Sequence, residues 1–80
     1  MSRVRVEYFA VLREQAGLNE ETIDTSARTA AQLYAQLAER HGFDLAQGRL
    51  KLAVNAQFRD WSTELRDGDE VVFIPPVAGG

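Results

Sequence analysis

The residues best suited to chemistry stand at the end of the sequence, Pro75-Pro76-Val77-Ala78-Gly79-Gly80. The two prolines favour an extended chain, and the small residues after them would let this segment enter a narrow channel in another protein. Fully extended, the segment would reach about 20 Å. A frayed terminus is the ordinary alternative. The pattern nevertheless makes the unhindered carboxylate of Gly80 our candidate reactive group.

This carboxylate needs activation before it can react. An α-carboxyl group has a pKa of about 3.3–3.7, so it is ionised at neutral pH and is a poor electrophile. An acyl-adenylate made from ATP would be reactive, but the sequence contains no P-loop and no glycine-rich nucleotide motif. We therefore expect no bound cofactor here, and we expect a partner protein to use the ATP.

Composition argues against several other kinds of site. The chain has no cysteine and one histidine, His41, so disulfides, thiolate metal sites and a cysteine nucleophile are excluded and no metal site is expected. The net charge is −3 and the basic residues are scattered, which disfavours nucleic acid as a partner. Without a long apolar run or a signal-like start, we expect no membrane contact and a cytoplasmic location.

Periodicity predicts the elements that must position the tail. Alternating apolar residues indicate strands near residues 3–8, 21–25, 50–55 and 70–74, and residues 58–65 read as a short edge strand and a loop. A short helix is expected over 11–16, closed by Gly17, and the main helix over 30–41. Thr29 and Gln32 form a capping-box pattern at its start, and Gly42 ends it. Its apolar stripe comprises Ala30, Leu33, Tyr34, Leu37 and Ala38.

This order of elements predicts an α+β protein of the β-grasp (ubiquitin-like) type. One main helix packs across a mixed sheet, the last strand lies beside the first, and residues 75–80 leave as a free C-terminal tail after a domain of residues 1–74. Strand parity places Phe9 with Arg3 and Arg5 on the solvated face, and Ile74 on the corresponding face of the last strand. We expect the two to meet there, with Phe58 joining them, as a docking patch.

Several of these segments together resemble the small subunit of molybdopterin synthase, the MoaD family. The resemblance runs through Phe9-Ala10, Leu12-Arg13-Glu14, Ala53-Val54-Asn55, Asp67-Gly68-Asp69-Glu70-Val71 and the segment from Pro75 to Gly80. The resemblance covers essentially the whole chain. Its most specific part is the combination of the segment from Asp67 to Val71 with the segment from Pro75 to Gly80. It implies a sulfur carrier that is part of a sulfurtransferase and is not catalytic alone.

The resemblance also implies the partners and the residue roles. An adenylating enzyme of the MoeB type would form a glycyl-adenylate on Gly80, and a sulfur donor would convert it to a thiocarboxylate. The tail would enter the large, MoaE-type subunit of a heterotetramer, where two such sulfurs convert cyclic pyranopterin monophosphate to molybdopterin. Gly79 would be the flexible neighbour and Arg13 an ionic contact at the rim. The partner-binding set is Phe9, Phe58, Ile74, Arg13, Pro75, Pro76, Val77 and Ala78.

Other functions remain open from the residues alone. The same fold serves as a sulfur carrier for thiazole (thiamine) synthesis, as a ubiquitin-like modifier of lysines, or as a plain interaction domain. His41 could be an acid–base catalyst, although a position near the negative end of the helix dipole is the simpler interpretation. Asp67, Asp69 and Glu70 could suggest a cation site, but Asp-Gly-Asp is first of all a turn.

Overall fold

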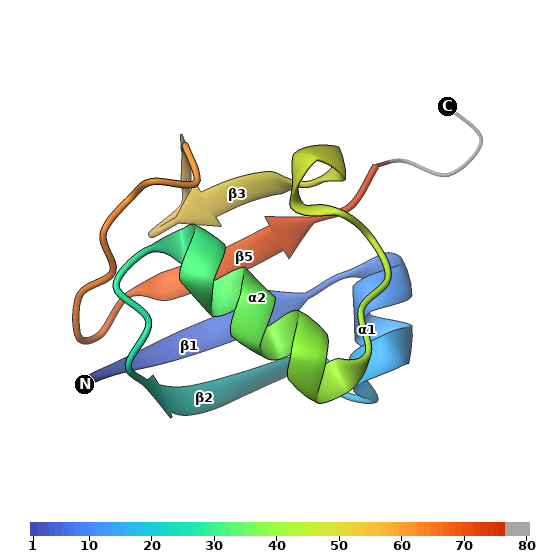
Figure 1. The fold of residues 1–80 in the computed structure, drawn as a ribbon, viewed down its shortest axis with the longest axis horizontal. Coiled ribbons are helices and arrows are strands. Elements are labelled where there is room, and N and C mark those ends of the chain that lie inside the picture. Colours follow the sequence, from blue (N-terminus) through green and yellow to red (C-terminus); the bar gives the residue numbers. More distant parts are fainter. Residues whose placement is uncertain (77–80) are drawn as a thin grey trace.

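The computed structural model describes residues 1–76, and Val77, Ala78, Gly79 and Gly80 lie outside the described residues. The elements follow the predicted order (Figure 1). They are β1 (Ser2–Tyr8), α1 (Ala10–Ala16), β2 (Glu20–Thr25), α2 (Ala30–His41), a 3₁₀ turn (Gln47–Arg49), β3 (Lys51–Val54), β4 (Gln57–Arg59) and β5 (Glu70–Ile74). The segment after residue 57 is therefore a short edge strand followed by a loop, as predicted.

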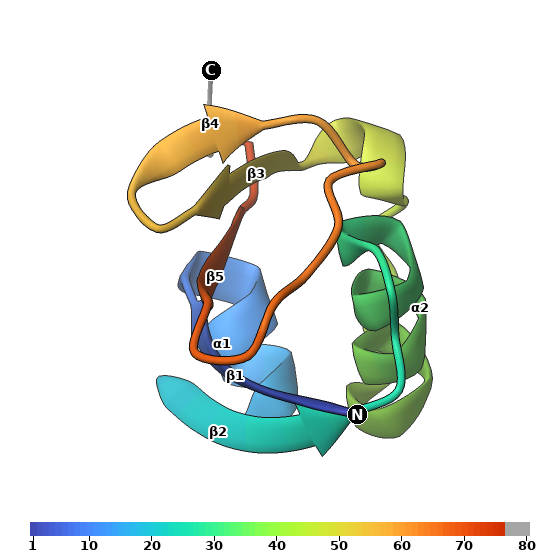
Figure 2. The same cartoon turned by 90° about the vertical axis from the view of Figure 1, so that its left-hand side faces the viewer.

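The strands form one mixed sheet of five strands in the order β2-β1-β5-β3-β4. β5 runs parallel to β1, with Val6 opposite Val71, whereas the other neighbouring pairs are antiparallel. The last strand thus lies beside the first at the centre of the sheet, as expected. α2 crosses one face of the sheet, and Figure 2 shows this as two layers. The predicted β-grasp architecture is confirmed.

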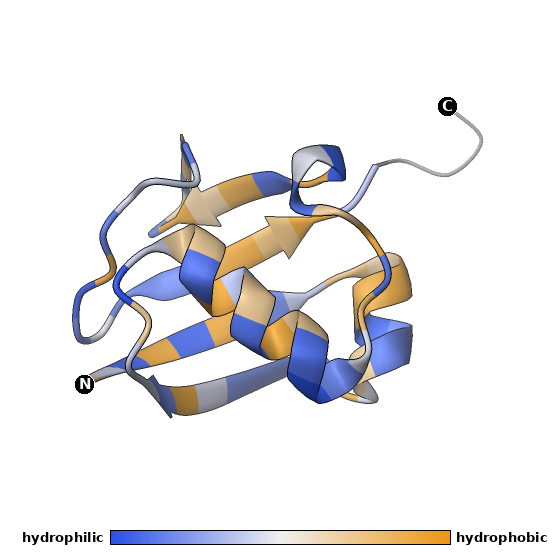
Figure 3. Cartoon of the chain, in the orientation of Figure 1, coloured by the Kyte–Doolittle hydropathy of each residue, from blue (hydrophilic) through white to orange (hydrophobic). Residues whose placement is uncertain are grey.

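The core lies between α2 and the covered face of the sheet. The apolar faces of the elements turn inward, and Figure 3 shows the alternation along the strands. The largest fully buried side chains are Tyr8, Phe73, Leu12, Leu33, Leu37, Leu52, Val4, Val6 and Val71. Tyr34, predicted for the helix stripe, is also buried, and Trp61 packs parallel to Phe73 with ring centroids 5.8 Å apart. Ala38 of the same stripe is only partly buried.

The ends of α2 follow from its sequence. The hydroxyl of Thr29 accepts a hydrogen bond from the backbone N–H of Gln32 at 3.3 Å. The Gln32 side chain reaches back one residue further than a standard capping box, since its oxygen accepts from the backbone N–H of Arg28 at 2.7 Å. Gly42 ends the helix in the left-handed conformation, with φ at 75°. Within residues 1–76, no helix is long and apolar enough to cross a membrane.

Candidate functional site

The predicted tail begins at a hollow at one end of the sheet. Here α1, the loop after α2 and the end of β5 come together, on the right of Figure 1. The hollow has a volume of about 600 Å³, and its apolar lining includes Val11, Leu45, Ile74 and both prolines. Pro75 is buried and Pro76 is exposed. The fold therefore buries the first residue of the predicted tail and leaves the second one exposed.

Phe9 and Ile74 line this same hollow. Phe9 directly follows β1 and has an extended backbone, with φ −126° and ψ 152°, so the alternation of the strand continues through it. Its side chain is 44% exposed and Ile74 is partly exposed. The expectation that these two residues meet beside the tail agrees with the structure, whereas their role in docking stays a prediction.

Phe58 occupies a different place from the one expected. It lies on β4, is 72% exposed, and does not line the hollow. The registers place it opposite Ala53, which is opposite Val72 on β5. β3 therefore lies between Phe58 and β5, so Phe58 shares the open face of the sheet with Phe9 and Ile74 but lies apart from the hollow, and its role in docking stays a prediction. We call the surface formed by Phe9, Ala53, Phe58, Val72 and Ile74 the docking face.

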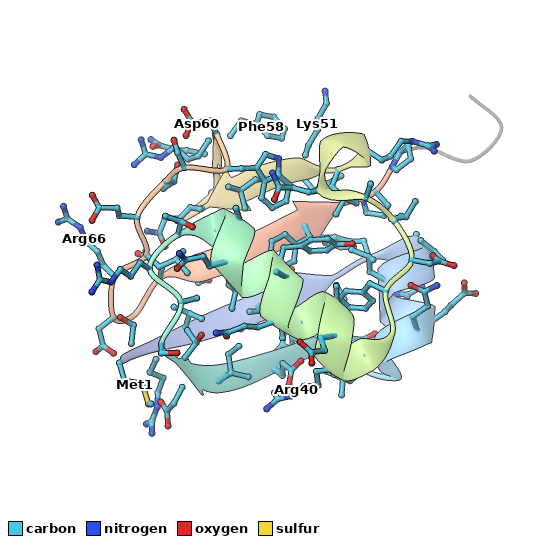
Figure 4. All side chains as sticks on the ribbon, viewed as in Figure 1. Met1, Arg40, Lys51, Phe58, Asp60 and Arg66 are labelled. Carbon is cyan, nitrogen blue, oxygen red and sulfur yellow. The ribbon has the colours of Figure 1, made fainter. Side chains whose placement is uncertain are left out.

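Positive charge borders the docking face at two points. Lys51 stands opposite Ile74, and its Nζ atom lies 5.9 Å from the centre of the Phe58 ring. Figure 4 shows the two labelled side chains of Lys51 and Phe58 next to each other above β3. Arg13 of α1 contributes to the hollow together with Glu14. Arg13 is thus at the rim of the apolar surface, where an ionic contact was predicted.

A network of carboxylates around Arg5 continues the open face of the sheet. The guanidinium of Arg5 lies 2.7 Å from Glu20, 3.2 Å from Glu70 and 3.5 Å from Glu7. The hydrogen bond to Glu20 and the surrounding negative charge raise the pKa of Arg5. Because these side chains are substantially exposed, the ion pairs contribute little to folding. For the function of the protein, the position of these carboxylates beside the docking face matters more than their contribution to folding.

His41 belongs to a buried polar contact that sequence reasoning missed. Its Nε2 atom lies 2.7 Å from Oε2 of Glu21, which also accepts a hydrogen bond from the Tyr8 hydroxyl at 2.5 Å. Burial alone would raise the pKa of Glu21, but the hydrogen bonds from Tyr8 and His41 lower it overall. Burial, followed by the bond to Glu21, raises the pKa of Tyr8. The contact joins β2 to the end of α2, and His41 does not line the hollow at the tail.

The segment from Asp67 to Asp69 is a turn, as predicted, with φ of Gly68 at 90°. Asp69 is buried, and its carboxylate accepts hydrogen bonds from the Asn55 side chain at 2.9 Å and the Arg66 backbone at 2.8 Å. These contacts fix the turn before β5. Within residues 1–76, no group of three or more histidine, aspartate and glutamate side chains is placed to hold a metal ion.

The fold and the apolar face beside the tail define a ubiquitin-like protein of the β-grasp class. Residues 6–80 match the model of the ThiS family, and the chain belongs to that family. Curated relatives include the molybdopterin synthase sulfur carrier subunits of Escherichia coli K12 (35% identical; 96% of this chain and 99% of the relative) and Mycobacterium tuberculosis (39%; all of both chains). A solved complex of subunits 1 and 2 of molybdopterin-converting factor from Helicobacter pylori contains a chain of similar fold. It is 32% identical with a TM-score of 0.69, and the match covers 98% of this chain and 99% of that one.

Proposed function

We propose that this chain is the sulfur carrier subunit of a molybdopterin synthase. The observation that carries the proposal is the match over nearly the whole length to curated subunits of that name. The apolar hollow at the root of the predicted tail, lined by Phe9 and Ile74, supports it because a carrier must dock before its end can reach another active site. The same surface would serve the large synthase subunit and the adenylating enzyme in turn.

The proposed chemistry takes place on the carboxylate of Gly80. A carboxylate oxygen attacks the α-phosphorus of ATP, pyrophosphate leaves, and a mixed anhydride with AMP forms. Hydrosulfide from the sulfur donor then attacks the glycyl carbonyl and AMP leaves, which gives a thiocarboxylate. In the synthase, the thiocarboxylates of two carrier chains transfer their sulfur atoms to cyclic pyranopterin monophosphate, and water supplies the oxygen that restores the carboxylate on each Gly80. Each step uses the terminal carbonyl group, which is why a residue without a side chain suits this position.

The chain's own contribution to catalysis is presentation of the tail. The partner enzymes supply ATP binding and the pterin site, so we expect the free chain to be inactive as a sulfurtransferase. Pro75 fixes the direction in which the chain leaves β5, because the fold buries it and its ring restricts φ. Gly79 would give the last residues the freedom to enter a narrow channel.

Deletion of Gly80 tests this proposal. A chain ending at Gly79 should fold with an unchanged thermal midpoint, because the truncation leaves residues 1–76 intact. It should support no molybdopterin formation when mixed with the large subunit, the adenylating enzyme, ATP and a sulfide source. Full activity of the shortened chain would contradict the proposal. Amide-linked adducts on lysines, with no thiocarboxylate under any condition, would favour a protein modifier instead.

A further inference from the structure

The docking face has a sharp charge boundary that restricts what can cover it. One row of residues crosses the open face of the sheet through successive register pairs: Phe58, Ala53, Val72, Glu7 and Glu20. The β4, β3 and β5 positions of this row are apolar, and the β1 and β2 positions are carboxylates. The change from apolar to acidic occurs between neighbouring strands, from Val72 to Glu7.

The carboxylates beside this boundary carry more negative charge than the neighbouring guanidinium of Arg5 can neutralise. Glu7, Glu20 and Glu70 all lie within 3.5 Å of the single guanidinium of Arg5. Three negative groups share one positive group, so two negative charges in excess remain at this place. In the free protein, water solvates them, since all four side chains are between 36% and 51% exposed.

A partner that covers the docking face must also cover the carboxylates of Glu7 and Glu20 beside it. Neighbouring strands lie about 4.8 Å apart, which places Glu7 about 5 Å and Glu20 about 10 Å from Val72 along the row. A specific protein interface buries about 800 Å² on each side, a patch with a radius of about 16 Å. Such a footprint centred on Val72 includes both glutamates and removes them from water.

Removing a carboxylate from water is costly unless an opposite charge replaces the solvent. Arg5 is already shared, so the opposite charge has to come from the other protein. We propose that the partner covering the docking face carries an arginine or lysine that pairs with Glu7 and Glu20 beside an apolar centre. This inference rests on the proposed function for the identity of that partner, the large synthase subunit, and adds its charge pattern at this surface.

Charge complementarity of this kind also fixes orientation. Apolar contacts alone would permit the partner to rotate on the docking face. A basic group of the partner, placed over β1 and β2, allows only one orientation of the bound partner. A fixed orientation matters here, because the tail leaves from the end of β5 and has to point into the other active site. The carboxylates of Glu7 and Glu20 beside the docking face thereby set the orientation of the bound partner.

Charge reversal with a matched control tests the inference. Glu7→Lys and Glu20→Lys reverse the charge beside the docking face, and Glu39→Lys makes the same change at an exposed position of α2, on the other side of the sheet. Titration calorimetry with the large subunit should show about tenfold or greater weakening for the first two and less than about twofold for the control. Glu7→Gln, which keeps the size of the side chain, should give an intermediate loss.

Salt dependence provides a second measurement on the same variants. Wild-type affinity should fall between low and high salt, and this fall should be smaller in Glu7→Lys because the screened attraction has been removed. Equal affinity of Glu7→Lys, Glu20→Lys and Glu39→Lys at every salt concentration would overturn the inference while leaving the proposed function intact. Absence of wild-type binding to the large subunit would overturn both. Tight self-association of the free chain through this face, seen by sedimentation, would overturn the inference by assigning the face to a second copy.

Discussion

The carboxylate of Glu21 lies 2.7 Å from Nε2 of His41 and so ties the edge strand β2 to the last turn of α2. Both side chains are largely buried, with exposed fractions of 18% and 12%. The lowered pKa of Glu21 keeps it ionised at neutral pH, so the histidine nitrogen donates the hydrogen bond. The contact stabilises the fold at a distance from the tail.

Replacement of Glu21 by Gln should destabilise the protein at pH 7 by about 1–3 kcal/mol, because Tyr8 and His41 lose a charged acceptor. The folded-state pKa of Glu21 is below its ordinary value of 4.5. The stabilisation by the carboxylate is therefore present above about 4.5 and is lost as the pH falls through the lowered pKa. Urea unfolding of both proteins between pH 3 and 7 measures the difference.

The control for this experiment is Glu20→Gln on the same strand. Its carboxylate faces solvent and pairs with Arg5, so the loss should be about 0.5 kcal/mol or less. A pH-independent difference between wild type and Glu21→Gln, or equal losses from the two substitutions, would contradict the assignment.

Shortening the apolar side chains that line the hollow should weaken binding to the large subunit more than it lowers the stability of the fold. Phe9→Ala or Ile74→Ala should reduce affinity for the large subunit by about 1–3 kcal/mol, since aromatic and aliphatic anchors dominate such interfaces. The thermal midpoint of the free chain should change little by comparison, because neither side chain belongs to the buried core. Calorimetry and thermal unfolding of each variant provide both values.

Leu18→Ala is the matched control, because Leu18 is a partly exposed apolar residue that does not line the hollow. Its removal should leave affinity unchanged. A collapse in stability of Phe9→Ala, with normal affinity per folded molecule, would mean that Phe9 is a core residue.

The turn between β3 and β4 contains avoidable strain. Ala56 has φ at 67°, a left-handed conformation that costs a non-glycine residue about 1–2 kcal/mol. Ala56→Gly should therefore stabilise the protein by about 0.5–1 kcal/mol after the greater freedom of unfolded glycine is subtracted. The same exchange at exposed Ala35 in α2 should destabilise it by about 1 kcal/mol. If urea unfolding showed that both substitutions change the free energy of unfolding in the same direction, this explanation would be refuted.

The sequence predicted those features that depend on local pattern. Alternation placed Val6 and Phe73 on the covered face of the sheet and Ile74 on the opposite, open face, and the Thr29 cap and Gly42 predicted the bounds of α2 to the residue. Features that depend on register were missed. The separation of Phe58 from Ile74 is set by how β4 pairs with β3, and no local pattern encodes that pairing. The contact between Glu21 and His41 likewise depends on where α2 crosses β2.

The intact mass of the chain tests most directly whether Gly80 carries sulfur. The chain is incubated with ATP, a sulfide source and a MoeB-type adenylating enzyme, and its mass is measured before and after addition of the large subunit with cyclic pyranopterin monophosphate. We predict a gain equal to the exchange of one oxygen atom for sulfur, followed by its loss on transfer to the pterin. An unchanged mass with an active adenylating enzyme, or a sulfur that is not lost to the pterin, would contradict this role of Gly80.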